Sequence, residues 1–208
     1  EKHMYASRLA EHNVKEILLT SRSAQYAYLL KKAINCKRET AVLYRENECA
    51  LPLIDLLERG GVPYRVRMPD MTFFTHRVIL DIEAIVRFAY DPYDTDAFMQ
   101  IYYKLSTYLR RQEAIMLCEI SKSQGISVMD ALDLADGLSG GTLKSCRTIQ
   151  TNLWKLQADR ADKAIDRIDT MMGYGEYLMD HGIKRTKLSI LEGIGRNEPS
   201  AMHLLKRL

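Results

Sequence analysis

The sequence predicts an α/β segment followed by an all-α region. A partial parallel sheet of about three strands is expected within residues 1–72, and a multi-helix domain is expected at residues 73–208. Up to residue 68, short β-rich runs alternate with helical stretches, which is typical of βαβ units and their parallel strands. After Phe73 the apolar residues recur only with helical spacing. The 208 residues suffice for one large domain or two small ones.

Three strands and two helices are expected in the first part. The strand candidates are Ile17–Leu19, Thr40–Tyr44 and Val62–Val66. Ser21 or Ser23 can cap the first helix, whose apolar residues between Tyr26 and Ile34 follow i, i+3, i+4 spacing. The second helix is expected to end at Gly60-Gly61, since glycine accepts positive φ. Because a small parallel sheet needs more strands and two covered faces, completion by chain outside these residues is expected.

The second part is expected to contain only helices. The first predicted helix is 78–89, and the second carries Phe98, Ile101 and Tyr102 and can be capped by Asp94 or Thr95. The ranges that follow in chain order are 111–123, 128–135, 143–156, 161–172, 174–180, 187–193 and 200–208. Pro92 disfavours helical geometry in the residue before it, and Gly125 is expected to stop the third helix. The stretch from residue 143 to 172 is too long for one helix, and the polar pair Asp159-Arg160 marks the expected break.

Charge and composition exclude several classes of protein. Thirty Lys and Arg against 27 Asp and Glu give a net charge of +3, so any nucleic-acid contact must be local. No run approaches the ~20 apolar residues of a membrane span, and the N-terminus lacks a signal-peptide pattern. The four cysteines are widely spaced and do not indicate a disulfide framework. A cytoplasmic location is therefore expected.

The sequence contains none of the common catalytic, nucleotide-binding or metal-binding motifs. It has no G-x-x-x-x-G-K-[ST] loop, no C-x-x-C or H-E-x-x-H pair and no G-x-S-x-G turn. Gly173-Tyr174-Gly175 and Gly193-Ile194-Gly195 lack the third glycine of a dinucleotide loop, and helix termination explains them better. No catalytic, cofactor-binding or metal-binding residue is therefore predicted in this chain.

One group of polar residues indicates a binding site. Arg45, Glu46 and Asn47 follow the apolar run that ends at Tyr44, at the expected carboxyl edge of the sheet, where ligands bind in open α/β folds. Two residues apart on an extended backbone, Arg45 and Asn47 can face the same way and donate hydrogen bonds to phosphate oxygens. A surface arginine beside a turn-forming asparagine is the alternative interpretation.

Five sequence features occur in the order of a known family. They are Ala41–Asn47, Gly60–Tyr64, Phe73-Phe74 with Asp81-Ile82, Asp91–Asp94 with Ala97-Phe98, and Ala164–Leu178. Together they resemble superfamily 1 DNA helicases of the UvrD/PcrA/Rep type. The first three are similar to the L-Y-R-x-N, G-x-P-Y and F-F…D stretch that joins the RecA-like subdomain 2A to the helical subdomain 2B. The order and spacing agree from Val14 to Leu208.

The resemblance implies a fragment of an ATP-dependent 3′→5′ DNA helicase, with a partial RecA-like lobe (2A) at residues 1–72 and the helical insertion (2B) at residues 73–208. Such enzymes bind ATP and Mg²⁺ between two RecA-like lobes. The parent protein is therefore expected to hydrolyse ATP, whereas this chain lacks those motifs and is expected to be inactive, without a cofactor. The implied partners are single-stranded DNA or a duplex junction, the missing lobes of the same protein and a protein bound by the helical domain; no membrane is implied.

The same resemblance places Arg45 and Asn47 near the single-strand backbone. A second set of salt-dependent phosphate contacts is expected from Lys104, Arg110 and Arg111. These three occupy the place of the family's T-P-x-R-G-I-G element, which touches duplex DNA. Because this chain lacks those glycines, the close backbone approach to phosphate is lost, and duplex binding stays open.

Two other functions are compatible with the sequence. The first is a non-enzymatic helical protein-interaction module, with Tyr102, Tyr103 and Tyr108 as interface anchors. The second is a nuclease-associated helicase relative that has lost its catalytic activity.

Overall fold

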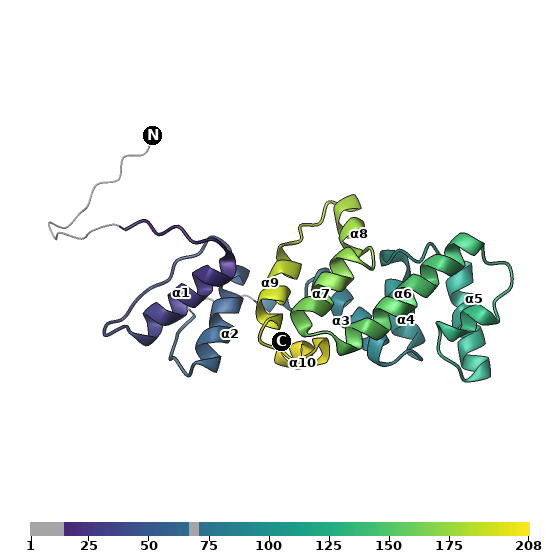
Figure 1. Cartoon of the computed structure of the whole chain (residues 1–208), viewed down its shortest axis with the longest axis horizontal. Coiled ribbons are helices and arrows are strands. Elements are labelled where there is room, and N and C mark those ends of the chain that lie inside the picture. Colours follow the sequence, from purple (N-terminus) through teal and green to yellow (C-terminus); the bar gives the residue numbers. More distant parts are fainter. Residues whose placement is uncertain (1–14, 67–70) are drawn as a thin grey trace.

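The computed structural model describes residues 15–66 and 71–208, in which ten α-helices and four short 3₁₀ helices form (Figure 1). The α-helices are α1 (Arg22–Ile34), α2 (Leu51–Arg59), α3 (Arg77–Tyr90), α4 (Thr95–Ile101), α5 (Arg111–Gln124), α6 (Gly140–Ala158), α7 (Ala161–Thr170), α8 (Tyr174–Asp180), α9 (Thr186–Gly195) and α10 (Ala201–Arg207). The 3₁₀ helices are η1 (Asn47–Ala50), η2 (Met71–Phe73), η3 (Tyr102–Lys104) and η4 (Asp130–Asp133). The molecule is elongated, with α1 and α2 at one end and α5 at the other.

The predicted α/β fold class is wrong, because the described residues form helices and no strand. The predicted strands Ile17–Leu19, Thr40–Tyr44 and Val62–Val66 are all irregular backbone. Leu18 and Leu43 in these runs are 89% and 94% exposed. A strand is stabilised by ladder hydrogen bonds and by packing of its side chains, and the runs obtain neither from the described part of the chain.

Most of the predicted helices are confirmed. Ser21 caps α1 and Asp94 caps α4, each by accepting a hydrogen bond from a backbone nitrogen in the first turn. The predicted break is also confirmed, because α6 ends at Ala158 and α7 begins at Ala161. Residues 128–135 differ from the prediction and contain only the 3₁₀ helix η4. No helix in the described ranges is both long enough and apolar enough to cross a membrane.

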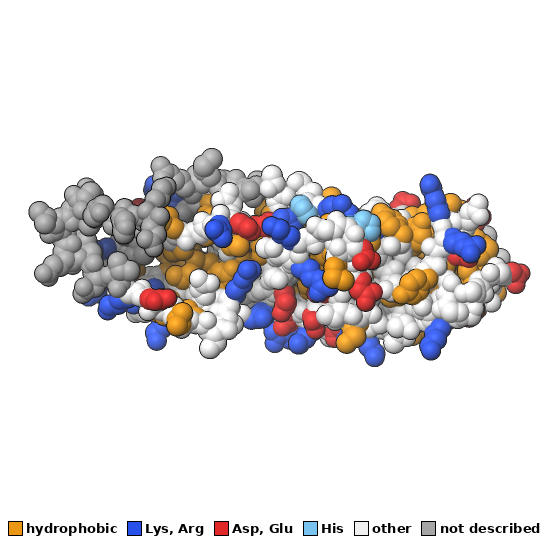
Figure 2. Space-filling view, turned by 90° about the horizontal axis from the view of Figure 1, so that it is seen from above, with side chains coloured by type: hydrophobic (Ala, Val, Ile, Leu, Met, Phe, Trp, Pro, Cys, Tyr) orange, Lys and Arg blue, Asp and Glu red, His pale blue; other side chains and the backbone are white. Residues whose placement is uncertain are grey.

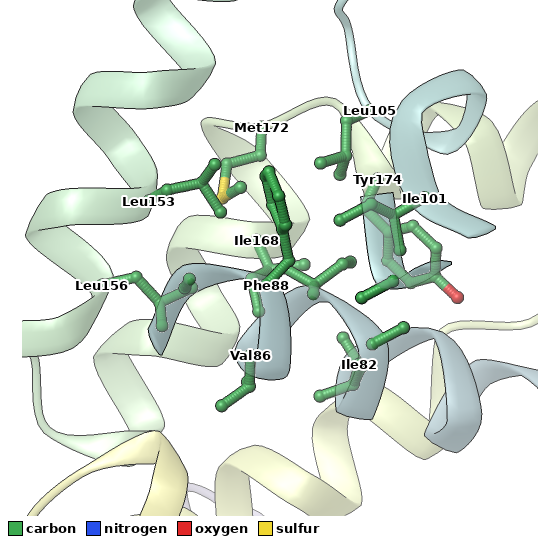
Figure 3. Packing of buried hydrophobic residues seen from close by; sticks show 14 of the residues in the cluster. Ile82, Val86, Phe88, Ile101, Leu105, Leu153, Leu156, Ile168, Met172 and Tyr174 are labelled. Carbon is green, nitrogen blue, oxygen red and sulfur yellow. The ribbon is translucent and has the colours of Figure 1, made fainter. Parts of the chain in front are cut away.

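One hydrophobic core extends from Phe73 to Leu204. Phe88 of α3 is almost fully buried, and Figure 3 shows it among side chains from α3, α4, α6, α7 and α8 and from the loops that follow η3 and α7. The labelled neighbours are Ile82, Val86, Ile101, Leu105, Leu153, Leu156, Ile168, Met172 and Tyr174. In contrast, α1 contributes no fully buried residue. The predicted domain boundary between residues 72 and 73 stays a prediction.

A buried carboxylate links α2 to the C-terminal helices. Asp55 is 4% exposed, and its two oxygens accept hydrogen bonds from Arg59, Asn197 and Arg207. A second ion pair joins Glu48 of η1 to Lys187 of α9 at 2.5 Å. These polar contacts supplement the packing of α2 on α9 and hold the N-terminal helices against the rest of the molecule.

Candidate nucleic-acid interface

Arg45 and Asn47 lie beside α2, where irregular backbone enters the 3₁₀ helix η1. Both side chains are exposed, and within the described residues neither has a hydrogen-bond or ion-pair partner. The sheet edge from which this site was predicted is not formed, because Thr40–Tyr44 is not a strand. The two side chains are nevertheless accessible to an anion, and their contact with DNA stays a prediction.

Lys104 of η3 forms an ion pair inside the protein. Its Nζ donates to Oδ1 of Asp81 on α3 at 2.5 Å, and the Lys104 side chain is only 12% exposed. Burial opposes the charged ammonium, but the hydrogen bond and charge of Asp81 outweigh it and raise the pKa of Lys104. In this arrangement the ammonium neutralises a buried carboxylate, so a phosphate would have to compete with Asp81.

Tyr174 completes this buried group. Its hydroxyl donates a 2.8 Å hydrogen bond to the second carboxylate oxygen, Oδ2 of Asp81. Burial and the neighbouring charge of Asp81 raise the pKa of Tyr174. No sequence pattern predicted this contact, although a charged residue such as Asp81 amid the apolar pattern of α3 indicates that a partner must exist elsewhere in the chain.

Arg110 and Arg111 mark the beginning of α5 and are both exposed. The Glu113 carboxylate accepts a 2.7 Å hydrogen bond from the Arg110 backbone nitrogen, which fixes the first turn of this helix. Neither guanidinium forms an ion pair within the described ranges. Two adjacent exposed guanidinium groups beside the single Glu113 carboxylate create a local positive potential that attracts phosphate.

Tyr108 precedes these arginines and has an unusual backbone conformation. Its φ is +56°, and no other non-glycine residue in the described part of the chain has a positive φ. The Tyr108 side chain is 71% exposed. The left-handed region costs a residue with a Cβ roughly 1–2 kcal/mol. The buried neighbours hold it there, since Thr107 Oγ1 donates to the Tyr102 carbonyl at 2.7 Å and accepts from the Leu109 nitrogen at 3.3 Å.

Gly173 fixes the position of the same loop. The Ser106 backbone nitrogen donates to the Met172 carbonyl at 2.9 Å, directly beside Gly173, whose φ is +83°. A Cβ at Gly173 would lie 3.1 Å from the Ser106 nitrogen and would also collide with the Ser106 side chain. Gly173 is the N-cap of α8 and follows the end of α7 at Thr170, so it begins a helix rather than ending one. Gly175 and Gly193 lie within helices, and the predicted role in helix termination fits only Gly195, the last residue of α9. The loop before α5 therefore packs tightly on the junction of α7 and α8.

Residues 5–177 match the family model of the UvrD-like helicase C-terminal domain. The chain belongs to this family. It is also similar to "Putative ATP-dependent DNA helicase YjcD" of Bacillus subtilis (strain 168), with 24% identity over 148 residues. The match covers 71% of this chain and 19% of that protein, so the chain spans about a fifth of the relative's length. The family resemblance of the sequence is confirmed at the level of the C-terminal helicase domain.

In this UvrD-like helicase C-terminal domain the predicted DNA contacts do not form one site. Arg45 and Asn47 lie next to α2, whereas Arg110 and Arg111 begin α5 at the opposite end of the molecule (Figure 1). Figure 2 shows Lys and Arg side chains interspersed with Asp and Glu on the face in view, without one continuous basic field. The residues predicted to contact DNA therefore lie on two separate surfaces.

The residues present do not fit a magnesium–nucleotide site. Across residues 15–66 and 71–208, no group of three or more His, Cys, Asp or Glu side chains is arranged to hold a metal ion. The sequence also lacks the glycine-rich loop and lysine that cradle nucleotide phosphates. Phosphate contact by the exposed side chains of Arg45, Arg110 and Arg111 stays a prediction.

Proposed function

We propose that this chain is part of an ATP-dependent 3′→5′ DNA helicase, to which it contributes DNA contacts and a regulatory helical region. The family match over residues 5–177 carries this proposal, and the helicase name of the Bacillus subtilis relative supports it. ATP and Mg²⁺ are then bound between RecA-like lobes elsewhere in the full-length protein. The helical region from α3 to α10 has its own core and can move or bind a partner as a unit.

In this proposal Arg45 and Asn47 hold the single-strand backbone. Their exposure and their lack of partners within the described residues support the assignment, because neither side chain has to leave an internal contact to bind phosphate. Arg45 supplies charge and Asn47 supplies a neutral donor, a combination that positions a backbone without reading its sequence.

A salt series on the full-length protein tests this contact. The Arg45→Ala variant is expected to bind a single-stranded oligonucleotide about three- to tenfold more weakly, and its salt slope is expected to fall by about 0.7. Lys155→Ala is the matched control, because Lys155 is exposed on α6 and has no partner in the described chain. Fluorescence anisotropy at several salt concentrations gives both quantities, and an affinity and slope equal to those of the control would refute the assignment.

Arg110 and Arg111 are proposed to contact the duplex side of a junction, with Lys104 engaged only if it leaves Asp81. The exposed, unpaired guanidinium groups support this contact, whereas the buried Lys104–Asp81 pair weighs against a role for Lys104. The double variant Arg110→Ala/Arg111→Ala is expected to reduce the salt slope for a tailed duplex by about 1–2. Lys122→Ala, at the other end of α5, removes a charge from the same helix and should have no such effect.

Protein binding is the second candidate function, and the exposed aromatic side chains favour it. Tyr103 and Tyr108 are 54% and 71% exposed, as an interface anchor requires. Tyr102 is only 8% exposed and packs against Phe98, so it belongs to the core. Capture of partners with and without nuclease treatment distinguishes the two functions, because a partner retained after nuclease treatment does not depend on DNA.

A further inference from the structure

A small cavity lies between the end of α3, the loop before α4, the segment before η4, and α6. Its volume is about 140 Å³, and none of the residues predicted to contact DNA lines it. Its apolar wall includes the buried residues Phe88, Met129 and Leu153. Two aromatic side chains that also line it, Tyr93 and Trp154, are each 59% exposed. The cavity therefore combines a core-like floor with an accessible aromatic rim.

Hydrogen bonds fix the polar side of this cavity. The buried Gln150 donates from Nε2 to Oδ1 of Asp130 at 3.0 Å and accepts from Nη1 of Arg147 at 2.8 Å. Arg147 in turn pairs with Asp133. The second oxygen of the Asp130 carboxylate, Oδ2, has no hydrogen-bond partner within the described residues. Asp130 is exposed, so this oxygen is accessible to a donor that approaches the cavity from solvent.

The charge of the cavity favours a cation. Asp130 is its one charged lining residue in the described part of the chain, where neither Lys, Arg nor His contributes to the lining. The exposed Asp91 precedes the lining residue Pro92, and its Oδ1 accepts a 3.1 Å hydrogen bond from the backbone nitrogen of Tyr93. Arg147, which donates to the lining residue Gln150, is already paired with Asp133. Asp130 and the nearby Asp91 therefore leave a net negative charge at the cavity, which disfavours an anionic phosphate.

The volume of the cavity is suited to one side chain of a partner rather than to a whole cofactor. An apolar cavity of about 150 Å³ holds one benzene molecule, whereas cofactor and drug sites usually occupy about 300–1,000 Å³. Tryptophan is the aromatic ring that attracts cations most strongly. Arginine fits this combination better than lysine, because its planar guanidinium can stack on an indole and donate to a carboxylate at the same time.

We propose that this cavity binds an arginine side chain presented by a partner protein. The aliphatic stem of that arginine packs against the exposed ring of Tyr93, its guanidinium stacks on the exposed ring of Trp154, and Oδ2 of Asp130 accepts a charge-assisted hydrogen bond from it. This site is independent of the proposed helicase function, since it shares no lining residue with the predicted DNA contacts.

The chain provides its own reporter for this site, because Trp154 is its single tryptophan. The 208-residue chain is titrated with the peptide acetyl-Gly-Gly-Arg-Gly-Gly-amide while the tryptophan emission is recorded. We expect a saturable change with Kd at or below about 1 mM, the range of a single side chain in a small site. The peptide with norleucine in place of arginine is expected to bind about tenfold more weakly, since it keeps the stem and loses the charge.

Two variants with the same change of charge complete the test. Asp130→Asn is expected to lower the affinity for the arginine peptide about tenfold, because a charge-assisted hydrogen bond is lost. Asp136→Asn removes an exposed carboxylate that does not line the cavity and should leave the affinity within about twofold. Equal binding of the norleucine peptide, equal weakening by both variants, or the absence of saturation would overturn the proposal. A single-stranded oligonucleotide that displaces the peptide from the cavity would also overturn it, in favour of a nucleic-acid site.

Discussion

Tyr174 donates a hydrogen bond to Asp81 across 93 residues of sequence, with 2.8 Å between its hydroxyl and Oδ2 of the carboxylate. The other oxygen of the same carboxylate accepts from Lys104 at 2.5 Å. One buried group therefore links α3, η3 and α8. The stability of the helical region should depend on all three side chains together.

We expect Asp81→Ala to reduce the free energy of unfolding by about 3–5 kcal/mol, because it leaves the Lys104 ammonium without a partner in a largely buried site. Tyr174→Phe should cost less, about 1–2 kcal/mol, since the Asp81–Lys104 pair remains. Urea denaturation followed by circular dichroism measures both differences. Exposed Asp136→Asn is the control for loss of a carboxylate, and equal stabilities of this control and Asp81→Ala would contradict the buried pair.

The Lys104 ion pair should also give the protein a specific alkaline sensitivity. Since the pKa of Lys104 is raised above its ordinary value of 10.5, its stabilising contribution is fully present below that pH and is lost as the pH rises through the folded-state pKa. The stability difference between wild type and Lys104→Met should therefore be constant near neutral pH and shrink above about pH 10.5. Urea titrations at a series of pH values show this, and a difference that grows at alkaline pH would refute it.

Gly173 and Gly137 permit a matched test of close packing, because both have φ of +83°. Alanine at Gly137 meets nothing within 4 Å, so it should cost only the roughly 1–2 kcal/mol of left-handed strain. Alanine at Gly173 also collides with Ser106 and should cost about 1–3 kcal/mol more. Thermal unfolding compares the two variants. Similar melting temperatures would mean that the loop before α5 can move away from the added Cβ without loss of stability.

The cysteines should react with an alkylating reagent in a fixed order. The Cys36 thiol is exposed, and its hydrogen bond with Thr40 lowers its pKa. Burial raises the pKa of Cys146 to about 11, so this thiol stays protonated at neutral pH. Iodoacetamide near pH 8, followed by peptide mass spectrometry, should modify Cys36 first and Cys146 last. Early modification of Cys146 would indicate that the contact between α6 and the loop before α5 opens readily.

Local signals in the sequence predicted the helical region well. Ser21 and Asp94 cap their helices through side-chain oxygens that act on the next few backbone nitrogens, and this chemistry is complete within one turn. The break before Ala161 likewise follows from neighbouring polar residues. The predicted strands failed for the opposite reason, since a run such as Thr40–Tyr44 becomes a strand only when a distant segment supplies its hydrogen bonds.

The candidate site shows the same division between local and distant information. The sequence by itself determined most of the helices after residue 73, though not the segment 128–135, and it determined the local distribution of charge and the membership of the UvrD-like helicase C-terminal domain family. Only the tertiary structure decided that Lys104 faces Asp81 and Tyr174, that Tyr108 projects from a left-handed turn, and that Trp154 borders a cavity. Side-chain partners far apart in the chain are chosen by the packing of whole helices, and no spacing rule along the sequence specifies that packing.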